Sequence, residues 1–290
     1  MKVSGFTFIR NAVKFDYPIV EAIRSILPIC DEVIVAVGQS DDSTRQLIEN
    51  IDTNKIRIID TVWDDSLLEG GRVLAEETNK AFAEISPDTD WCFYIQGDEI
   101  LHEKFHEPVL QGMRRYKDQK QVEGLLFKYL HFYGSYDYVG NSRRWYSHEI
   151  RVIRNDRSIR SYRDAQGFRK DGRKLNVKPL DAYIYHYGWV RHPHKMLQKN
   201  VGFERLYNED RHSRTISKDS IQEFDYSEID SLELFKGTHP QVMLDRITRK
   251  NWTFEFDITR KNFKLKGWLH FWVEKLTGKR LFEYKNYKII

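Results

Sequence analysis

Two neighbouring carboxylates follow an apolar segment in the first half of the chain. Trp91 to Ile95 are apolar, and Gln96-Gly97-Asp98-Glu99 comes directly after them. Burying such a pair is costly unless a cation or hydrogen bonds compensate the charge. A divalent metal would remove the repulsion, and oxygen ligands with an imidazole suit Mn²⁺ or Mg²⁺. We therefore expect a metal site at Asp98 and Glu99; the simpler alternative is that Asp98 caps a helix beginning near residue 104.

A histidine in the second half of the chain also ends an apolar segment. Residues 182–185 are typical of a strand, and His186 follows them. A neighbouring strand could bring this imidazole to the same cleft as Asp98, where it would be a further metal ligand. The alternative is a structural histidine packed by Tyr187 and Trp189.

A polar turn follows another strand pattern earlier in the chain. Residues 33–37 form an uninterrupted apolar run, typical of a strand buried on both faces, and Gly38-Gln-Ser-Asp-Asp-Ser-Thr44 leads from it into a helix. Flexible backbone, exposed N–H groups and a helix start suit a nucleotide or another polar ligand. The alternative is plain helix capping by Asp42 or Ser43. The chain lacks a Gly-x-Gly-x-x-Gly motif, a phosphate-loop lysine and a Gly-x-Ser-x-Gly elbow, which argues against the enzymes that use them.

The elements that must position these residues alternate between strand and helix patterns over the first hundred residues. Strands are expected at residues 3–9, 33–37, 56–59 and 91–95, with amphipathic helices between them. Four such units predict a mostly parallel sheet with right-handed crossovers and helices on both faces. Ligands bind beyond the carboxyl ends of such strands. The turn at residues 38–44 and the segment at residues 96–99 would therefore face one cleft.

The pattern changes after residue 100. A helix around residues 104–116 and a long strand at 124–133 precede a loop-rich segment, residues 143–174, with eleven Arg or Lys against four acidic residues. That segment is either a solvated basic face or a surface for an anionic ligand such as phosphate. From Pro193 onward the chain is mainly helical in pattern. We expect a catalytic region at residues 1–190 and a helical extension at residues 191–290 packed on it.

Composition narrows the class of protein. The chain has 290 residues, 40% of them hydrophobic, and a net charge of +4. It shows no finger spacing or aromatic-basic module for nucleic acid. Cys30 and Cys92 fit reduced core thiols, and without a signal peptide or a membrane-spanning stretch a cytoplasmic location is expected. Residues 263–276 mix aromatics with lysines, which predicts either a helix packed on the body or a peripheral contact at the inner face of the membrane.

The order of these features resembles the nucleotide-sugar glycosyltransferases of the GT-A fold, particularly the bacterial family-two type. The resemblance covers about residues 3–190 and depends on three patterns: the strand–turn–helix at 38–44, the small-residue helix at 74–81 with its Asn, and the Asp-x-Asp-like end of the strand at 96–99. It implies an α/β, GT-A-like fold. It also implies an enzyme, an inverting hexosyltransferase, that moves a sugar from a nucleoside-diphosphate sugar to a glycan or lipid-linked acceptor in cell-surface polysaccharide synthesis.

The resemblance also implies roles for individual residues. Asp98 would bind the metal that bridges the donor diphosphate, with Glu99 sharing the task and His186 as a further ligand. An inverting transfer needs a general base; the first candidate is Asp164, in a polar loop, and the second is Glu149. The residues expected at the donor are Gly38, Ser40, Asp41, Asp42, Gly71, Arg72, Asn79, Gln96, Arg151, Arg154 and Arg163.

Two positions depart from the family pattern. Gln96 stands where the metal motif usually has its first acid, and Val37 stands where a base-contacting Asp is usual, a role that Asp41 or Asp42 could take. These departures leave open a catalytically inactive relative that binds glycans or assists assembly. A sugar-1-phosphate nucleotidyltransferase is a more distant alternative, because residues 8–11 lack the Gly-rich, Arg-containing loop of those enzymes.

Overall fold

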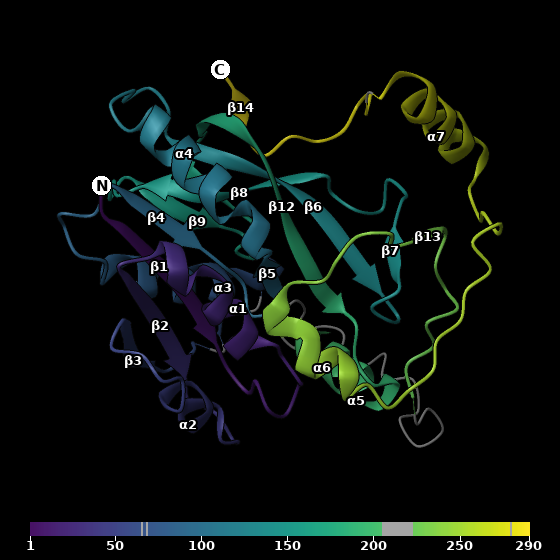
Figure 1. Ribbon diagram of the computed structural model, residues 1–290, viewed down its shortest axis with the longest axis horizontal. Coiled ribbons are helices and arrows are strands. Elements are labelled where there is room, and N and C mark those ends of the chain that lie inside the picture. Colours follow the sequence, from purple (N-terminus) through teal and green to yellow (C-terminus); the bar gives the residue numbers. More distant parts are fainter. Residues whose placement is uncertain (65, 68, 205–222, 279) are drawn as a thin grey trace.

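The computed structural model describes residues 1–64, 66–67, 69–204, 223–278 and 280–290. Its centre is a twisted sheet flanked by helices (Figure 1). Four parallel strands lie in the order β3-β2-β1-β4, and the sheet continues through β8, β6 and β7 to β13. These strands are β1 Val3–Ile9, β2 Glu32–Gly38, β3 Ile56–Thr61, β4 Trp91–Tyr94, β6 Gly124–Tyr133, β7 Tyr138–Gly140, β8 His148–Arg154 and β13 Leu232–Leu234.

The alternation of side chains along β2 explains why apolar residues continue without interruption. Val33, Val35 and Val37 pack into one core, and Ile34 and Ala36 pack into a second core on the other face. Helices α1 (Ile19–Ile26) and α4 (His106–Tyr116) cover the first core, and α3 (Arg72–Ala83) covers the second. Since both faces of the strand are buried, every position is apolar. The predicted α/β fold with a mostly parallel sheet and flanking helices is confirmed.

The long strand β12 (Asn176–Trp189) connects the two halves of the molecule. It runs parallel to β6 and antiparallel to the short β5 (Glu99–Leu101), with His186 opposite Glu99 in register. This pairing brings the carboxyl end of β12 to the end of β4. The sequence separation between the two is 88 residues, so only the sheet brings His186 and Asp98 together.

The basic segment at residues 143–174 is not loop-rich, and the prediction was wrong here. It contains the central strand β8 and a small antiparallel sheet of β9 (Ile159–Tyr162), β10 (Gly167–Lys170) and β11 (Arg173–Lys174). In β8, Glu149 and Arg151 alternate with Ile150 and Val152, a pattern that resembles a solvent-exposed edge. Both charged side chains are nevertheless buried. Glu99, 52 residues earlier in the chain, neutralises the buried Arg151.

The extension at residues 191–290 contains helices but also adds strands to the sheet. Its described helices are α5 (Pro193–Glu204), α6 (Leu244–Thr248) and α7 (Leu265–Thr277). The short helix α2 (Thr44–Glu49) follows β2 in the first half of the chain. β13 pairs with β7, and β14 (Lys288–Ile289) pairs with β12. Residues 205–222 of the predicted helical stretch lie outside the described residues, and the boundary at residue 190 stays a prediction. In the described chain, no helix combines the length and apolar character needed to cross a membrane.

A buried ion pair joins β5 to β8. Glu99 and Arg151 are both fully buried, and two N–H groups of Arg151 donate to the two Glu99 oxygens at 2.7 Å each. The Tyr129 hydroxyl on β6 donates to Glu99 at 2.7 Å, and the Gln96 N–H donates at 3.1 Å. Four hydrogen bonds therefore hold one carboxylate at the centre of the sheet.

Glu99→Gln should cost about 3–5 kcal/mol of unfolding free energy, because it leaves the Arg151 charge buried without its counter-ion. Urea unfolding measures the loss. The control is Glu84→Gln, which breaks the exposed Arg57–Glu84 pair at 2.9 Å and should cost less than about 1 kcal/mol. If both variants lost the same small amount of unfolding free energy, a structural role for Glu99 would be contradicted.

Candidate functional site

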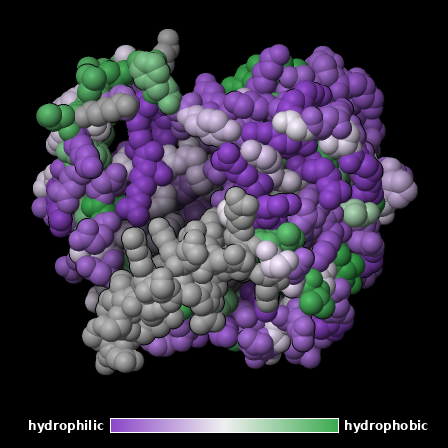
Figure 2. Space-filling model, turned by 180° about the vertical axis from the view of Figure 1, so that it is seen from behind, coloured by the Kyte–Doolittle hydropathy of each residue, from purple (hydrophilic) through white to green (hydrophobic). Residues whose placement is uncertain are grey.

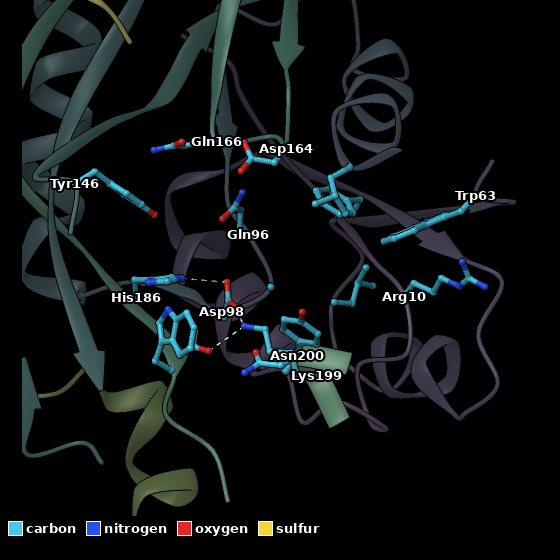
Figure 3. A pocket seen from close by; sticks show the side chains of 17 residues that line it. Arg10, Trp63, Gln96, Asp98, Tyr146, Asp164, Gln166, His186, Lys199 and Asn200 are labelled. Atoms are coloured by element: carbon cyan, nitrogen blue, oxygen red, sulfur yellow. Dashed lines mark hydrogen bonds and ion pairs between the residues drawn. The ribbon is translucent and has the colours of Figure 1, made fainter. Parts of the chain in front are cut away.

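A cleft of about 650 Å³ opens beyond the carboxyl ends of β1, β4 and β12 (Figure 3). This is where open α/β sheets bind their ligands. The lining residues come from strand ends, the turn between β9 and β10, and α5: Phe8, Ile9, Arg10, Tyr17, Trp63, Leu74, Gln96, Gly97, Asp98, Tyr146, Asp164, Gln166, His186, Gly188, Trp189, Lys199 and Asn200. The volume and the mixed aromatic and charged walls suit a small polar ligand with a flat ring.

Asp98 lies at the centre of the cleft, and its two oxygens face different groups. Oδ1 lies 3.7 Å from Nε2 of His186. Oδ2 lies 3.2 Å from Nζ of Lys199 and 3.8 Å from a guanidinium nitrogen of Arg191. Lys199 Nζ also donates to the carbonyl oxygen of Gly188 at 2.9 Å. One oxygen is thus neutralised by cations, and the other faces an imidazole.

A second histidine fixes which nitrogen of His186 carries the proton. Nε2 of His131 lies 2.9 Å from the Tyr146 carbonyl, which can only accept, so His131 carries its proton there. Its Nδ1 is then an acceptor, and Nδ1 of His186 donates to it at 3.0 Å. Burial lowers the pKa of both rings, so both are neutral at pH 7. The Nε2 lone pair of His186 therefore points toward Asp98.

The charges around Asp98 keep it ionised in spite of its burial. Burial alone would raise its pKa, but Lys199 and Arg191 hold the pKa of Asp98 well below its usual range, as does His186 at the acidic pH where its ring is protonated. Burial and the charge of Arg191 lower the pKa of Lys199 to about 8, with Asp98 opposing them. The cleft thus holds a permanent carboxylate beside an ammonium that titrates close to neutral pH.

Asp98 and His186 fit a divalent cation on one side only. Oδ1 of Asp98 and Nε2 of His186 are facing acceptors, and a cation between them would relieve their repulsion. Gly188 leaves room there, because a Cβ on it would lie 2.5 Å from Nε2 of His186 and 3.0 Å from Oδ2 of Asp98. No group of three or more His, Cys, Asp or Glu side chains suited to a metal occurs among the described residues. Ligand oxygens and water would have to complete the coordination.

Asp164 lines the cleft from the turn between β9 and β10, facing the side of Gln96 (Figure 3). Its neighbours Arg163 and Ala165 have φ angles of 57° and 62°, in the left-handed region that non-glycine residues seldom adopt. Strain of this kind persists where the surrounding structure holds the backbone in place. The Ala165 carbonyl accepts a hydrogen bond from Nε2 of Gln96 at 3.2 Å, which fixes the turn to the end of β4.

Gln96 lines the cleft with its amide nitrogen engaged. Besides Ala165, Nε2 donates to the Tyr94 hydroxyl at 3.3 Å. These two bonds orient the amide and leave its oxygen as the remaining polar atom of the side chain. Gln96 therefore connects the floor of the cleft to the Asp164 turn.

Glu149 lies behind the cleft and does not line it. Its Oε1 accepts from Nε2 of Gln166 at 2.9 Å, and its Oε2 is buried with no hydrogen-bond partner. Burial raises the pKa of Glu149 to about 8, against the opposing influence of Arg151 and Gln166. This carboxyl group is protonated at neutral pH, which disfavours it as a proton acceptor. Gln166, whose side chain reaches the cleft, separates it from the ligand.

Four other predicted site residues are engaged elsewhere. Glu99 and Arg151 form the central ion pair. Arg154 lies 3.8 Å from the Trp91 ring centre and donates to the carbonyls of residues 116, 119 and 122. Arg163 is exposed and packs on Tyr162. None of these four side chains is among the described residues that line the cleft.

The turn after β2 lines a separate pocket of about 330 Å³, together with residues of β3. Val37, Gly38, Ser40 and Asp42 belong to it. Asp42 accepts hydrogen bonds from the N–H groups of Thr44 and Lys14 at 2.9 and 2.6 Å, and Asp41 lies 3.4 Å from the Lys14 ammonium. Gly38 still shapes the main cleft, because any Cβ on it would lie 2.3 Å from Nε1 of Trp63.

Gly71, Arg72 and Asn79 do not line the cleft, although Leu74 in the first turn of α3 does. Gly71 takes a φ of 73° at the helix start, and Arg72 is exposed. Asn79 is buried, and its Oδ1 accepts from the N–H of Ser161 at 2.8 Å. Asn79 therefore holds β9 against α3.

Several residues that line or adjoin the cleft were not predicted from the sequence. Lys199 and Arg191 lie beyond residue 190, outside the stretch that carried the family resemblance. His131 lies within β6, where nothing in the local pattern separates it from a core histidine. Arg10 and Trp63 each follow a strand, at β1 and β3, and that placement was the available signal.

Comparisons with known proteins found no matching family model and no matching curated protein. Structures similar to this chain include S. aureus TarS residues 1–349, with 16% identity, 65% of this chain and 61% of that chain covered, and a TM-score of 0.42. The same fragment in complex with UDP-GlcNAc has 15% identity, coverages of 70% and 65%, and a TM-score of 0.42. Glucosyl-3-phosphoglycerate synthase from Mycobacterium tuberculosis, with Mn²⁺, UDP and phosphoglyceric acid, has 19% identity, coverages of 45% and 43%, and a TM-score of 0.30.

These three structures match only part of this chain. The chain spans less than two thirds of the length of each of them. A likeness at these TM-scores says nothing about what this chain binds or transfers, so the function has to be inferred from the cleft itself.

The raised pKa of Glu149 predicts a pH-dependent loss of stability. The unfolded chain releases this proton near pH 4.5 and the folded chain only near pH 8. Folding therefore becomes less favourable between about pH 5 and 8. Glu149→Gln removes the titration, so its stability relative to the native protein should rise over that range by on the order of 3 kcal/mol. Urea unfolding at pH 5 and pH 8 measures this, and a difference independent of pH would refute the shift.

Proposed function

We propose that this protein is a glycosyltransferase that moves a hexosyl group from a nucleoside-diphosphate sugar, with Asp98 and His186 holding a divalent Mn²⁺ or Mg²⁺. The supporting observation is the pair of facing acceptors, Oδ1 of Asp98 and Nε2 of His186, in a cleft large enough for a nucleotide sugar. The metal, when bound, would neutralise charge on the leaving diphosphate.

The chain's own residues supply the remaining parts of the reaction. Lys199 and Arg10 place cationic groups on the cleft wall, where a diphosphate would accumulate charge as the glycosidic bond breaks. Trp63, Phe8 and Trp189 offer ring faces to a base or a sugar. Asp164 would accept the proton of the acceptor hydroxyl in a transfer that inverts the anomeric centre.

The acceptor we propose is a glycan or a lipid-linked saccharide of cell-surface polysaccharide synthesis. An open cleft between strand ends and α5 would admit the end of such a chain beside Asp164. The competing function is an inactive glycan-binding or assembly subunit. It is favoured by Gln96 in the metal motif and by the two cations that already neutralise Oδ2 of Asp98.

Binding of UDP or GDP should require Mn²⁺ or Mg²⁺, and Asp98→Asn should weaken it by tenfold or more because it removes the charged metal ligand. Calorimetry measures the affinity, and release of free sugar from a panel of nucleotide sugars measures turnover. The control is Asp181→Asn, since Asp181 pairs with Lys128 on the surface, 90% exposed.

Three outcomes separate the candidate functions. Metal-dependent binding with donor turnover that Asp98→Asn abolishes supports the transferase. Binding with equal background turnover in the native and Asp98→Asn proteins supports the inactive subunit. Absence of nucleotide binding with either metal, or release of pyrophosphate from a nucleoside triphosphate, overturns the transferase, and the pyrophosphate would identify a nucleotidyltransferase instead.

We also propose that α7 contacts the inner face of the membrane. Its residues Leu265, Leu269, Trp272 and Leu276 are 91%, 64%, 48% and 79% exposed, at spacings of four, three and four residues, which places them on one helix face. α7 stands away from the sheet in Figure 1, and apolar side chains gather over it at the upper left of Figure 2.

Charge favours an anionic lipid surface over a second copy of the chain. Residues 260–280 carry seven Lys or Arg against a single acid, Glu274. Two such segments would repel each other. The headgroups of an anionic bilayer would instead attract the lysines, and its acyl chains would bury the apolar stripe.

The double variant Leu269→Glu/Leu276→Glu should lose at least tenfold in binding to vesicles that contain phosphatidylglycerol, measured by flotation. The control is Leu244→Glu on α6, because Leu244 is 49% exposed but lies outside the stripe. Unchanged vesicle binding in the double variant, or loss of a dimer in its place, would refute the lipid contact.

A further inference from the structure

A second cavity, of about 490 Å³, lies on the other side of the loop after β1 from the main cleft. Val13 and Asp16 of this loop line it, whereas Tyr17 lines the main cleft. The two cavities share no lining residue. The other lining residues belong to the start of α5, to α6 and to the segments after β6 and α6: Tyr136, His192, His194, Lys195, Arg246, Arg249, Lys250, Asn251 and Trp252.

The cavity carries an excess of positive charge. Asp16 is the one carboxylate among the described lining residues, and it pairs with Arg246 at 2.5 Å. Glu21, outside the cavity, lies 3.3 Å from the same guanidinium. Arg246 is therefore neutralised, and the excess comes from Lys195, Arg249 and Lys250.

In the described part of the chain, these three cations are held by backbone carbonyls and not by carboxylates. Nζ of Lys195 donates to the Lys14 carbonyl at 3.0 Å, and Nζ of Lys250 donates to the Trp252 carbonyl at 2.8 Å. Nε of Arg249 donates to the Asp245 carbonyl at 3.1 Å. Each cation keeps N–H groups for a ligand, and their mutual repulsion would be relieved by an anion.

One wall of the cavity is aromatic and well anchored. The Trp252 Nε1 donates to the Gly134 carbonyl at 2.8 Å, and its ring lies 6.3 Å from both Tyr136 and His192. Tyr136 is only 3% exposed. A fixed ring face beside three cations matches a ligand with both a sugar ring and a phosphate, because the C–H face of a sugar packs on indole and phosphate binds Lys and Arg.

We propose that this cavity binds a phosphorylated saccharide. Arg249, Lys250 and Lys195 take the phosphate, and Trp252 packs against the sugar ring. The site goes beyond the transfer reaction proposed above and does not depend on it, since no residue of the cavity lines the cleft around Asp98. Lys195, which lines the cavity, lies one turn of α5 away from Lys199, which lines the cleft.

Titration calorimetry with glucose 6-phosphate, inorganic phosphate and glucose tests the proposal. Glucose 6-phosphate should bind more tightly than either of the others, since only it engages both the cations and the ring. Arg249→Gln/Lys250→Gln should weaken its binding at least tenfold. The matched control is Arg114→Gln/Arg115→Gln on α4. It removes two adjacent charges from a helix that does not line the cavity and should leave binding unchanged.

The outcomes also separate this site from the main cleft. UDP binding with Mn²⁺ should be the same in the native and the Arg249→Gln/Lys250→Gln proteins. Displacement of glucose 6-phosphate by UDP would place it in the main cleft and overturn the proposal. Equal affinities for inorganic phosphate and glucose 6-phosphate would contradict the saccharide contact. An equal loss of affinity in the control variant would show that the net charge of the protein, and not this cavity, causes the effect.

Discussion

The ion pair between Glu99 and Arg151 determines how the end of β4 is used. Glu99 opens β5 and points into the sheet, where Arg151 and Tyr129 neutralise it. Asp98, one residue earlier, belongs to the turn and points into the cleft. Two carboxylates that adjoin in sequence thus face opposite environments, so they do not share one cation. The apolar strand can end in two acids because each finds separate positive partners.

That division explains which parts of the site the sequence could predict. Strands β2 and β4 could be predicted because their side chains are apolar on both faces, and β1 and β3 from their Val, Ile and Phe residues. Asp98 and His186 could be predicted because each follows an apolar run. The role of Glu99 could not, since its partner lies 52 residues away on a strand whose alternating charges resemble a surface. Arg151 and Arg154 likewise looked like ligand contacts, because burial of an arginine leaves no local sign in the sequence.

The electrostatics at Asp98 depend on how its oxygens are divided. Cations beside Oδ2 stabilise the carboxylate and weaken its attraction for a metal at Oδ1, because like charges would lie only a few ångströms apart. A diphosphate would reverse this balance by adding negative charge next to both the metal and Lys199. In the proposed transferase, metal and nucleotide should therefore bind cooperatively, and Gln96 in place of an acid would leave still more of the coordination to the ligand.

The extension after β12 completes the cleft. Arg191 and Lys199 come from it, and the start of α5 separates the cleft from the cationic cavity. The family pattern covers residues 3–190 and therefore includes Asp98. It omits Arg191 and Lys199, the two cations that keep the Asp98 carboxylate ionised. Because α5 contributes to both cavities, a change in its position would alter the field at Asp98 and the phosphate site together. Lys199 of α5 thus supplies an ammonium beside Asp98 that the strands of the sheet do not provide.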